Sequence, residues 1–352
     1  MSATLKDVAR RAGVSVKTVS NVVNGYVHVK ENMRERVRIA LEELDYQPNL
    51  SARYLRTGRM GVLALAIPDL MNAYFSDISN AIITSASSQS YTVLVDHTEG
   101  DRLKERMVID GLRPQLIDGI ILSALGLDAQ DLQARKTELP LVLLGECFLN
   151  DPYDHISVDN VAAATLATTH LLELGRRRIA AIGSPDDDDR SGTDTAHLRL
   201  HGYTKALVDV GQSPEPALIV PTKPFATDTR PHTLKQVFYT REGGSEAMQR
   251  LLALSQPPDA VFCFNDLMAL GAIRALHKAG RRIPDDVAVV GFDDIEEGCF
   301  STPSLTTIAP DKKMIGELAV SFLLGRINGT RTGPPEHVEV PFQLIIREST
   351  SG

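Results

Sequence analysis

The chain has 352 residues, of which 43% are hydrophobic and 23% charged, and its formal net charge is −8. This composition excludes disordered chains, collagens and coiled-coil rods, and the length predicts two or three domains of roughly 100 to 200 residues each. No apolar run reaches the roughly 18 residues that a membrane helix needs. The amino terminus lacks the apolar core of a secretory signal, and Cys147, Cys263 and Cys299 have no metal-binding spacing. We therefore expect a cytoplasmic protein without membrane partner, cofactor or metal.

The charge is distributed unevenly along the chain. Residues 1–59 contain eleven Lys and Arg against six Asp and Glu, a net charge of +5, which leaves −13 on the remaining 293 residues. A small cationic segment suits a polyanion, whereas DNA would repel a large anionic body. The asymmetry indicates a nucleic-acid-binding head, although a basic arm without function has the same charge.

The head begins with the pattern of two short helices. Thr4 and Asp7 have the spacing of a capping box, and Gly13 is expected to end the first helix. Ser15 is expected to cap a second helix that ends at Asn24-Gly25. Two short helices joined by a glycine-containing turn predict a helix-turn-helix.

A third helix is expected over residues 31–44, and the three helices together predict a small apolar core. The residues expected in that core are Leu5, Val8, Ala9, Ala12, Val19, Val22, Val23, Met33, Val37, Ala40, Leu41 and Leu44. A three-helix domain with so small a core is too small to do much besides bind another molecule.

Specific runs of residues resemble a known family. The head and the segment after it contain TLKDVARRAGVSVKTVSNVVNG and YQPNLSARYL, and the rest contains IPDLMNAYF, LLELGRRRIA, FCFNDLMALGAIRAL, IPDDVAVVGFDD and TPSLTTI. In this order, and over essentially the full length, they resemble the LacI/GalR family of bacterial transcription repressors. The resemblance implies a DNA-binding regulator, not an enzyme, with a small-molecule effector. We expect a homodimer or a higher oligomer on a pseudo-palindromic operator, because one head reads too few base pairs for useful specificity.

The second helix is expected to read DNA, because a recognition helix enters the major groove with its first residues facing base edges. Val16, Lys17 and Asn21 point away from the valine stripe and match the base-reading positions of the family. Lys17 suits guanine, Asn21 suits adenine, and Val16 suits a thymine methyl group, with a core valine as the alternative. The residues expected to contact phosphates, or to act simply as caps and surface hydroxyls, are Thr4, Ser15, Thr18, Ser20 and Asn24.

A hinge is expected over residues 48–59, between the head (residues 1–47) and the body (residues 60–352). Its run NLSARYLR is too short to hold a helix in water and should fold on binding. The resemblance implies that the hinge helix pairs with its twin and drives Leu55 into the minor groove, which kinks the duplex. The hinge residues assigned to this contact are Ala52, Arg53 and Leu55; Arg53, Arg56 and Arg59 suit phosphates or a solvated linker.

From Met60 onward, apolar strands alternate with amphipathic helices. The expected strands are 60–67, 91–96, 119–123, 141–145, 178–183, 217–221, 260–265 and 287–292. The expected helices are 75–88, 103–113, 160–174, 196–210, 244–254 and 266–279. This alternation predicts an α/β body of two doubly wound parallel lobes. The resemblance implies the same, because the body of the family is similar to a type I periplasmic binding protein. We expect three crossings between lobes, near Asp159, Asp294 and Gly325, which give an N lobe of about 60–159 and 295–325 and a C lobe of about 160–294 and 326–352.

Polar side chains just beyond the strand ends are the effector candidates, because ligands of open α/β sheets bind there. The resemblance implies contacts from Asn265, Asp266, Asp293 and Arg199, and from an aromatic pair whose rings can cover a sugar or base. The full set of candidates is Tyr74, Phe75, Glu146, Arg199, Asn265, Asp266 and Asp293, with Asp96 as a further strand-end acid. Asp266 is equally suited to cap a helix.

Other clusters have plainer explanations. The Asp186–Asp189 run with Arg190 lacks EF-hand spacing and is expected to be a solvated loop. His197 and His201 are four residues apart but lack the HExxH glutamate, so a surface or pocket-lining pair is expected. Arg176, Arg177 and Arg178 are expected to complement the carboxyl end of a helix and its loop.

These patterns predict a repressor whose operator affinity is switched by an effector, for which a neutral sugar or polyol is favoured over a purine or phosphosugar corepressor. A transport-type binding protein is disfavoured by the basic head and the missing secretory signal. An enzyme is disfavoured because the sequence contains no Walker loop, GxGxxG after a strand, GxSxG or paired Cys-His site.

Overall fold

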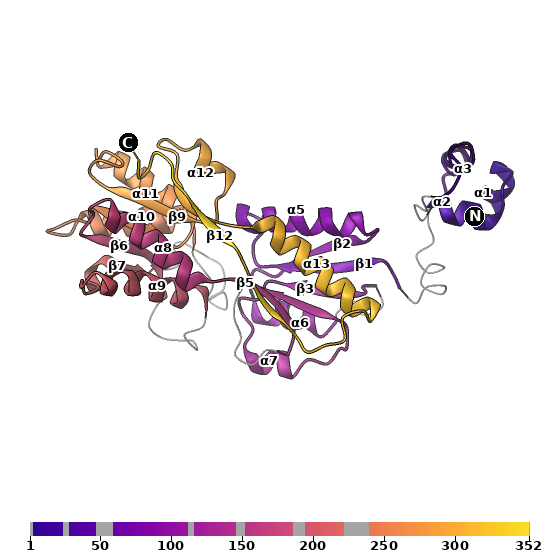
Figure 1. Cartoon of the computed structure of the whole chain (residues 1–352), viewed down its shortest axis with the longest axis horizontal. Coiled ribbons are helices and arrows are strands. Elements are labelled where there is room, and N and C mark those ends of the chain that lie inside the picture. Colours follow the sequence, from indigo (N-terminus) through magenta and orange to yellow (C-terminus); the bar gives the residue numbers. More distant parts are fainter. Residues whose placement is uncertain are drawn as a thin grey trace. The chain divides into compact units, whose positions relative to one another are not determined.

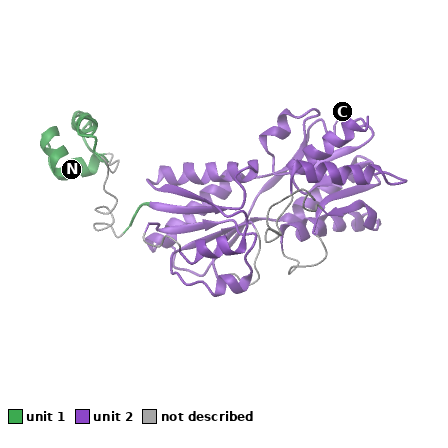
Figure 2. Ribbon diagram, turned by 180° about the vertical axis from the view of Figure 1, so that it is seen from behind, with its two compact units in different colours: residues 1–61 green, residues 62–352 purple. Residues whose placement is uncertain are grey.

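The structure divides the chain into a small and a large unit. It is a computed structural model that describes residues 3–23, 28–46, 59–111, 116–145, 152–185, 194–221 and 239–351. The two compact units are residues 1–61 and residues 62–352, coloured green and purple in Figure 2. Within the described ranges, no helix combines the length and the apolar character that crossing a membrane requires.

The head forms the three predicted helices, α1 (Leu5–Ala12), α2 (Val16–Val23) and α3 (Glu31–Glu43). The predicted capping box is confirmed: Thr4 Oγ1 accepts the N–H of Asp7 at 3.3 Å, and the Asp7 carboxylate accepts the N–H of Thr4 at 3.1 Å. Gly13 ends α1 with φ of 62°, in the left-handed region that glycine adopts at little cost. Ser15 caps α2, since its Oγ accepts the N–H of Thr18 at 3.0 Å.

The head core is a single apolar cluster made by all three helices. Its fully buried members are Val8, Ala9, Ala12, Val19, Val37 and Ala40. The prediction for Met33 is wrong: its side chain is 36% exposed, because it lies in the first turn of α3 and the buried face of that helix begins one turn later, at Val37. The predicted end of α2 at Asn24-Gly25 lies outside the described residues.

The first lobe of the body, called the N lobe, is a parallel sheet in the order β11-β5-β4-β3-β1-β2. Its strands are β1 (Val62–Ile67), β2 (Thr92–His97), β3 (Gly119–Leu122), β4 (Leu141–Leu144), β5 (Asp154–Val158) and β11 (His337–Val340). Its helices are α5 (Ala73–Ser88), α6 (Arg102–Ile109), α7 (Ala129–Gln133) and α13 (Lys312–Asn328). The central strands β1, β3 and β4 are fully buried, which explains their continuous apolar runs.

The second lobe, called the C lobe, has a sheet in the order β12-β10-β9-β8-β6-β7. Its strands are β6 (Ile179–Ser184), β7 (Ile219–Pro221), β8 (Ala260–Cys263), β9 (Ala288–Phe292), β10 (Thr306–Pro310) and β12 (Phe342–Ile345). Its helices are α8 (Asn160–Glu173), α9 (Thr195–Asp209), a 3-10 turn η1 (Pro216–Leu218), α10 (Arg241–Leu252), α11 (Asp266–Lys278) and α12 (Glu296–Phe300). The edge strand β12 is antiparallel to β10. The sheets of both lobes therefore have the predicted doubly wound α/β arrangement.

The chain passes between the lobes at Asp159, at Pro310-Asp311 and at Pro341 (Figure 1). The expected crossings near Asp294 and Gly325 are wrong. After Asp294 the chain forms β10, which pairs with β9 in the C lobe. Gly325 lies inside α13, which packs on α5 of the N lobe.

The contact between α13 and α5 explains why residues so distant in sequence share a lobe. Figure 1 shows α13, drawn in yellow, beside the purple α5. At Gly316 the two helices approach so closely that an added Cβ would lie 2.6 Å from the Cβ of Ala81. A larger residue there would push the helices apart. The observed N lobe thus comprises residues 62–158 and 312–340, and the C lobe residues 160–310 and 342–351.

Candidate effector cleft and DNA-reading head

Helix α2 carries the three predicted base readers. Val16 is 41% exposed, so it is not a core valine; it lies at the amino end of α2, three residues before the fully buried Val19 and on the same side of the helix. Lys17 and Asn21 lie on the side of the helix away from Val19; Lys17 is exposed and forms no ion pair with any described residue, and Asn21 is half-buried. The base contacts of all three residues stay predictions.

The hydroxyls predicted to contact phosphates lie at the amino ends of α1 and α2. Thr4 Oγ1 donates to Asp7 Oδ2 at 2.6 Å, and Ser15 Oγ lies 2.8 Å from Thr18 Oγ1. Both sites are caps, and helix amino ends also attract phosphate. Ser20 is half-buried. The remaining predicted DNA contacts, Asn24, Ala52, Arg53 and Leu55, lie outside the described residues.

In the body, Asp293 follows β9 and lies at the edge of the C lobe that faces α5. Its side chain is buried, and its backbone has φ of 114°, held by a hydrogen bond from its N–H to the carbonyl of Ile308 at 2.8 Å. Burial raises the pKa of Asp293 to about 7, against the opposing charges of Arg199 and Lys312. Near neutral pH this carboxyl can therefore either donate or accept a hydrogen bond.

Arg199, on α9, is 7% exposed and makes its described contacts within the C lobe. Its guanidinium carbon lies 3.5 Å from the centroid of the Phe292 ring. Its Nε donates to Asn160 Oδ1 at 2.9 Å, and its Nη1 donates to the carbonyl of Phe264. Arg199 thus ties together α8 and the ends of β8 and β9, and these two hydrogen bonds use two of the five N–H donors of its guanidinium group.

Tyr74 and Phe75 begin α5, which Asn72 caps by accepting the N–H of Tyr74 at 3.1 Å. The two rings meet edge to face with centroids 5.4 Å apart. Burial raises the pKa of the Tyr74 hydroxyl, and the nearby charge of Asp293 raises it further. Because Tyr74 belongs to the N lobe and Asp293 to the C lobe, the predicted aromatic and acidic candidates meet between the lobes.

Asn265 and Asp266 have different tasks at the start of α11. Asn265 is the cap: its Oδ1 accepts the N–H of Met268 at 2.9 Å, and its Nδ2 donates to the carbonyl of Tyr239 at 3.2 Å. The alternative that Asp266 caps the helix is therefore wrong, because Asp266 is already the first helical residue.

Asp266 holds the turn that carries Asp293. Its carboxylate is fully buried and accepts hydrogen bonds from Thr307 Oγ1 at 2.6 Å and from the N–H of Ile295 at 2.9 Å. Burial, followed by the charge of Asp293, raises the pKa of Asp266 well above its ordinary value. Direct contact of Asp266 with an effector stays a prediction.

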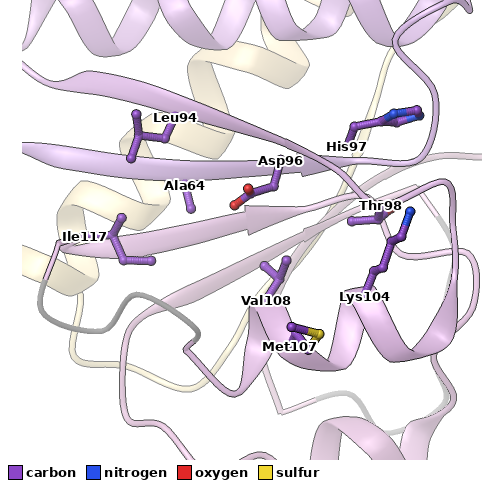
Figure 3. A pocket seen from close by; sticks show the side chains of 9 residues that line it. All are labelled: Ala64, Leu94, Asp96, His97, Thr98, Lys104, Met107, Val108 and Ile117. Atoms are coloured by element: carbon purple, nitrogen blue, oxygen red, sulfur yellow. The ribbon is translucent and has the colours of Figure 1, made fainter.

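One further strand-end candidate, Asp96, lies elsewhere in the N lobe. Asp96 lines a separate N-lobe pocket of about 150 Å³ between β2 and α6 (Figure 3). The other lining residues are Ala64, Leu94, His97, Thr98, Lys104, Met107, Val108 and Ile117. Glu146 lies outside the described residues, as do Cys147 and the Asp186–Arg190 run.

The remaining polar clusters are structural. His197 Nδ1 lies 2.7 Å from Asp194 Oδ2, and His201 is exposed. Among the described residues, no group of three His, Cys, Asp or Glu side chains is arranged as a metal site. Arg176 donates to the carbonyls of Pro284 and Asp285 at 2.6 and 3.2 Å, which lie in a loop about 108 positions away and not at the end of the preceding helix as predicted.

Three residues that bond to this group or to its neighbours escaped the sequence reasoning: Asn160, Asp77 and Lys312. Asn160 is the second residue after β5, so the same strand-end rule would have found it. Lys312 and Asp77 are 235 positions apart, and no local signal joins them.

The fold and the two sites define a DNA-binding regulator with a ligand-binding body, and comparison with known proteins shows its family. Residues 4–49 match the lacI family of bacterial regulatory proteins, and residues 168–350 match the periplasmic binding protein-like domain. The chain is 33% identical to the transcriptional repressor CytR of Escherichia coli (strain K12), over 99% of this chain and 96% of CytR.

Solved structures agree with the sequence comparison. The lac repressor dimer bound to operator and the anti-inducer ONPF is similar with a TM-score of 0.77 and 29% identity, over 99% of each chain. The complex of the regulator CelR with cellobiose has a TM-score of 0.69 and 29% identity, again over 99% of each chain. The protein belongs to the LacI family, whose members are DNA-binding transcriptional regulators and not enzymes.

Proposed function

We propose that the protein represses transcription from the cytoplasm by binding a pseudo-palindromic operator as a homodimer, and that a neutral sugar or polyol between its lobes changes this affinity. The observation that carries the proposal is the amino end of α2, where Val16 and Lys17 are exposed while Val19 is buried, on a head with a net charge of +5. A cationic helix amino end with free side chains is what the major groove accepts.

The division of labour on DNA follows from the chemistry of each side chain. Lys17 would donate to guanine, Asn21 would pair with adenine, and Val16 would pack on a thymine methyl group. The proposed phosphate contacts are Thr4, Ser15, Thr18, Ser20 and Asn24, and the proposed minor-groove contacts are Ala52, Arg53 and Leu55. Phosphate contacts set the register, while the base contacts choose the sequence.

A second copy of the chain is the proposed partner, and the edge of the N-lobe sheet supports this. Strand β2 is the outermost strand, so one row of its backbone groups has no neighbouring strand in the described sheet. Leu94 and Val95 on β2 are exposed large apolar side chains, as are Ile83 on α5 and Met107 on α6. Contact between two such edges would cover apolar surface that a monomer leaves in water.

The proposed effector is neutral and hydroxylated because of the charges in the cleft. Asp293 can donate to or accept from a hydroxyl near pH 7, and the rings of Tyr74 and Phe75 offer a flat apolar face. A phosphate would meet the carboxyls of Asp293 and Asp266, which oppose an anion, whereas Arg199 retains N–H donors beyond those bonded to Asn160 and Phe264. The ligand experiment therefore includes ribose 5-phosphate. The complex of CelR with cellobiose is an example of a similar protein with a bound sugar.

The candidates therefore divide into two proposed groups. Tyr74, Phe75 and Asp293 would touch the effector, while Arg199, Asn265 and Asp266 would hold the walls of the cleft in place. Glu146, outside the described residues, remains a prediction. A purine would also stack on Tyr74 and Phe75, so the ligand experiment must distinguish a purine effector from a sugar.

The experiment has two arms on the full-length protein. Selection from a random DNA library should enrich one pseudo-palindromic sequence, bound with a steep salt dependence; a pool without a common sequence would refute the DNA part of the proposal. Thermal-shift measurements with cellobiose, ribose, adenosine and ribose 5-phosphate should show stabilisation by a neutral sugar. Stabilisation by adenosine or ribose 5-phosphate alone would overturn the effector class.

A further inference from the structure

Lys312 is the first residue of α13, immediately after the second crossing between the lobes. Its Nζ donates to Asp77 Oδ2 at 2.6 Å and to the carbonyl oxygen of Asp294 at 2.8 Å. Asp77 belongs to α5 of the N lobe, and Asp294 follows β9 of the C lobe. A single ammonium group therefore bonds to both lobes at once.

The C-lobe partner of Lys312 is a turn with two consecutive unusual backbone conformations. Asp293 has φ of 114° and Asp294 has φ of 51°, both in the region that residues with a side chain rarely adopt. Such conformations persist only where the surroundings hold them, and they concentrate at ligand sites and switches. Asp293 is also the acid that we propose to contact the effector.

Several parts of the fold hold this turn. The N–H of Ile295 donates to buried Asp266, and Arg347, just after β12, donates to Asp294 Oδ1 at 2.7 Å. These contacts and the β10 carbonyl that accepts from Asp293 all come from the C lobe. Among the described residues that are hydrogen-bonded to the turn, only Lys312 is also bonded to a residue of the N lobe.

We propose that Lys312 is a positioning residue that couples the conformation of the Asp293-Asp294 turn to helix α5. This rests on the proposed function, because it explains how an effector at Asp293 would be reported to the N lobe. A ligand that moves Asp293 reorients the neighbouring Asp294 carbonyl, and the ammonium bonded to that carbonyl then changes its contact with Asp77. The flexible four-carbon stem and three donors of lysine allow both bonds to adjust together.

The competing explanation is an ordinary surface ion pair, which contributes little and transmits nothing. The coupling and the ordinary ion pair predict different effects, at the turn, of a substitution in the N lobe. Asp77 lies in the N lobe and is bonded to Lys312, and its charge also acts directly on Asp293. The coupling through Lys312 is therefore tested by whether Asp77→Asn still changes the turn when Lys312 is replaced.

Hydrogen exchange measured by mass spectrometry on the full-length protein decides between them, with the amides of residues 293–295 as reporters. Asp77→Asn should accelerate their exchange about three- to tenfold, as expected for easier local opening. Lys312→Met should do the same, and adding Asp77→Asn to Lys312→Met should have no further effect. Lys312→Arg, which keeps the charge and the donors, should restore slow exchange.

The matched control is Lys313→Met. Lys313 is the next residue, 83% exposed and paired only loosely with Glu317 at 3.7 Å, so exchange at residues 293–295 should stay as in the wild type. Unchanged exchange of the turn in Asp77→Asn, or an Asp77→Asn effect that persists in Lys312→Met, would overturn the coupling. The measurement uses neither DNA nor ligand, so such a failure leaves the proposed function standing, and a failed operator selection leaves the coupling standing.

Discussion

The guanidinium group of Arg199 lies flat against the ring of Phe292, 3.5 Å from its centroid, and thereby joins helix α9 to the strand that carries Asp293. The buried cation is also hydrogen-bonded to Asn160 and to the carbonyl of Phe264. It is the point where three segments of the C lobe meet beneath the cleft, so its removal should affect the whole lobe.

Arg199→Met should lower the free energy of unfolding by about 1 to 3 kcal/mol, because it leaves buried acceptors on Asn160 and Phe264 without a donor. Urea denaturation followed by circular dichroism measures this loss. Arg281→Met, at an exposed position, is the control and should stay within about 0.5 kcal/mol of the wild type. Equal stability of the two variants would contradict the role assigned to Arg199.

Lys17→Ala should weaken binding to the selected operator by about 1 to 3 kcal/mol and relax the preference at one base position. Fluorescence anisotropy with single-base operator variants measures both effects. Lys30→Ala, at an exposed residue just before α3, is the comparison: if it matters at all, it should weaken binding uniformly across sequences. A Lys17→Ala protein with unchanged base preference would exclude Lys17 as a base reader.

Leu55→Ala should weaken operator binding by about 1 to 2 kcal/mol, roughly tenfold, because a smaller side chain cannot hold the base step open. The thermal stability of the body and its shift with sugar should not change. Anisotropy and thermal shift on the same preparation test both statements, and wild-type operator affinity would refute the wedge.

The stability of the protein should depend on the charge of Asp293. The pKa of this buried acid is raised to about 7 from an ordinary value of 3.8, so between these values the folded state binds a proton that the unfolded state does not. Folding is thus favoured at low pH, and this contribution is lost as pH rises toward 7, with a slope of about 1 kcal/mol per pH unit.

Asp293→Asn removes that slope. The difference in unfolding free energy between Asp293→Asn and the wild type should therefore grow in favour of the variant from about pH 4 to pH 7 and stay constant above. Asp285→Asn, at an exposed acid, provides the control curve. Parallel curves for Asp293→Asn and the wild type would show that this carboxyl does not titrate in the range.

Leu94→Glu should prevent self-association, since it buries a charge in the proposed contact between two β2 edges. Light scattering coupled to size exclusion should show a monomer, and operator affinity should fall because one head remains per particle. Leu174→Glu places the same charge at an exposed apolar position on the C lobe and should remain dimeric. A dimeric Leu94→Glu protein would move the interface elsewhere.

The local signals of the head were sufficient to predict it. A capping box, a glycine in the left-handed region and a serine cap act over three or four residues, so Thr4, Gly13 and Ser15 could be assigned without tertiary information. The prediction that Met33 is buried was wrong, because helical periodicity does not say in which turn of a helix burial begins.

In the body, patterns predicted eight of the strands and six of the helices, but not β5, β10, β11, β12, α7, α12 or α13, nor which lobe receives each element near the carboxyl end. Residues 306–310 form β10 in the C lobe, and α13 then returns to the N lobe through its close approach at Gly316. The strand β10 pairs with β9 and β12, which are 16 to 38 positions away, whereas α13 packs on α5, about 235 positions away. The cleft follows the same division: the strand-end rule found Asn265 and Asp293, whereas Lys312 gains its role only from distant Asp77.

The crossings themselves determine what motion the two lobes can make. Pro341 is the single residue between β11 and β12, and its carbonyl accepts the N–H of Asp311 at 3.0 Å, so two of the crossing segments are bonded to each other where they pass. Both contain proline, whose φ is nearly fixed. Two of the three connections between the lobes are therefore short and bonded to each other, an arrangement that favours rotation of the lobes about this contact over their separation. A change in one lobe would therefore reach the other as a change in the angle between them.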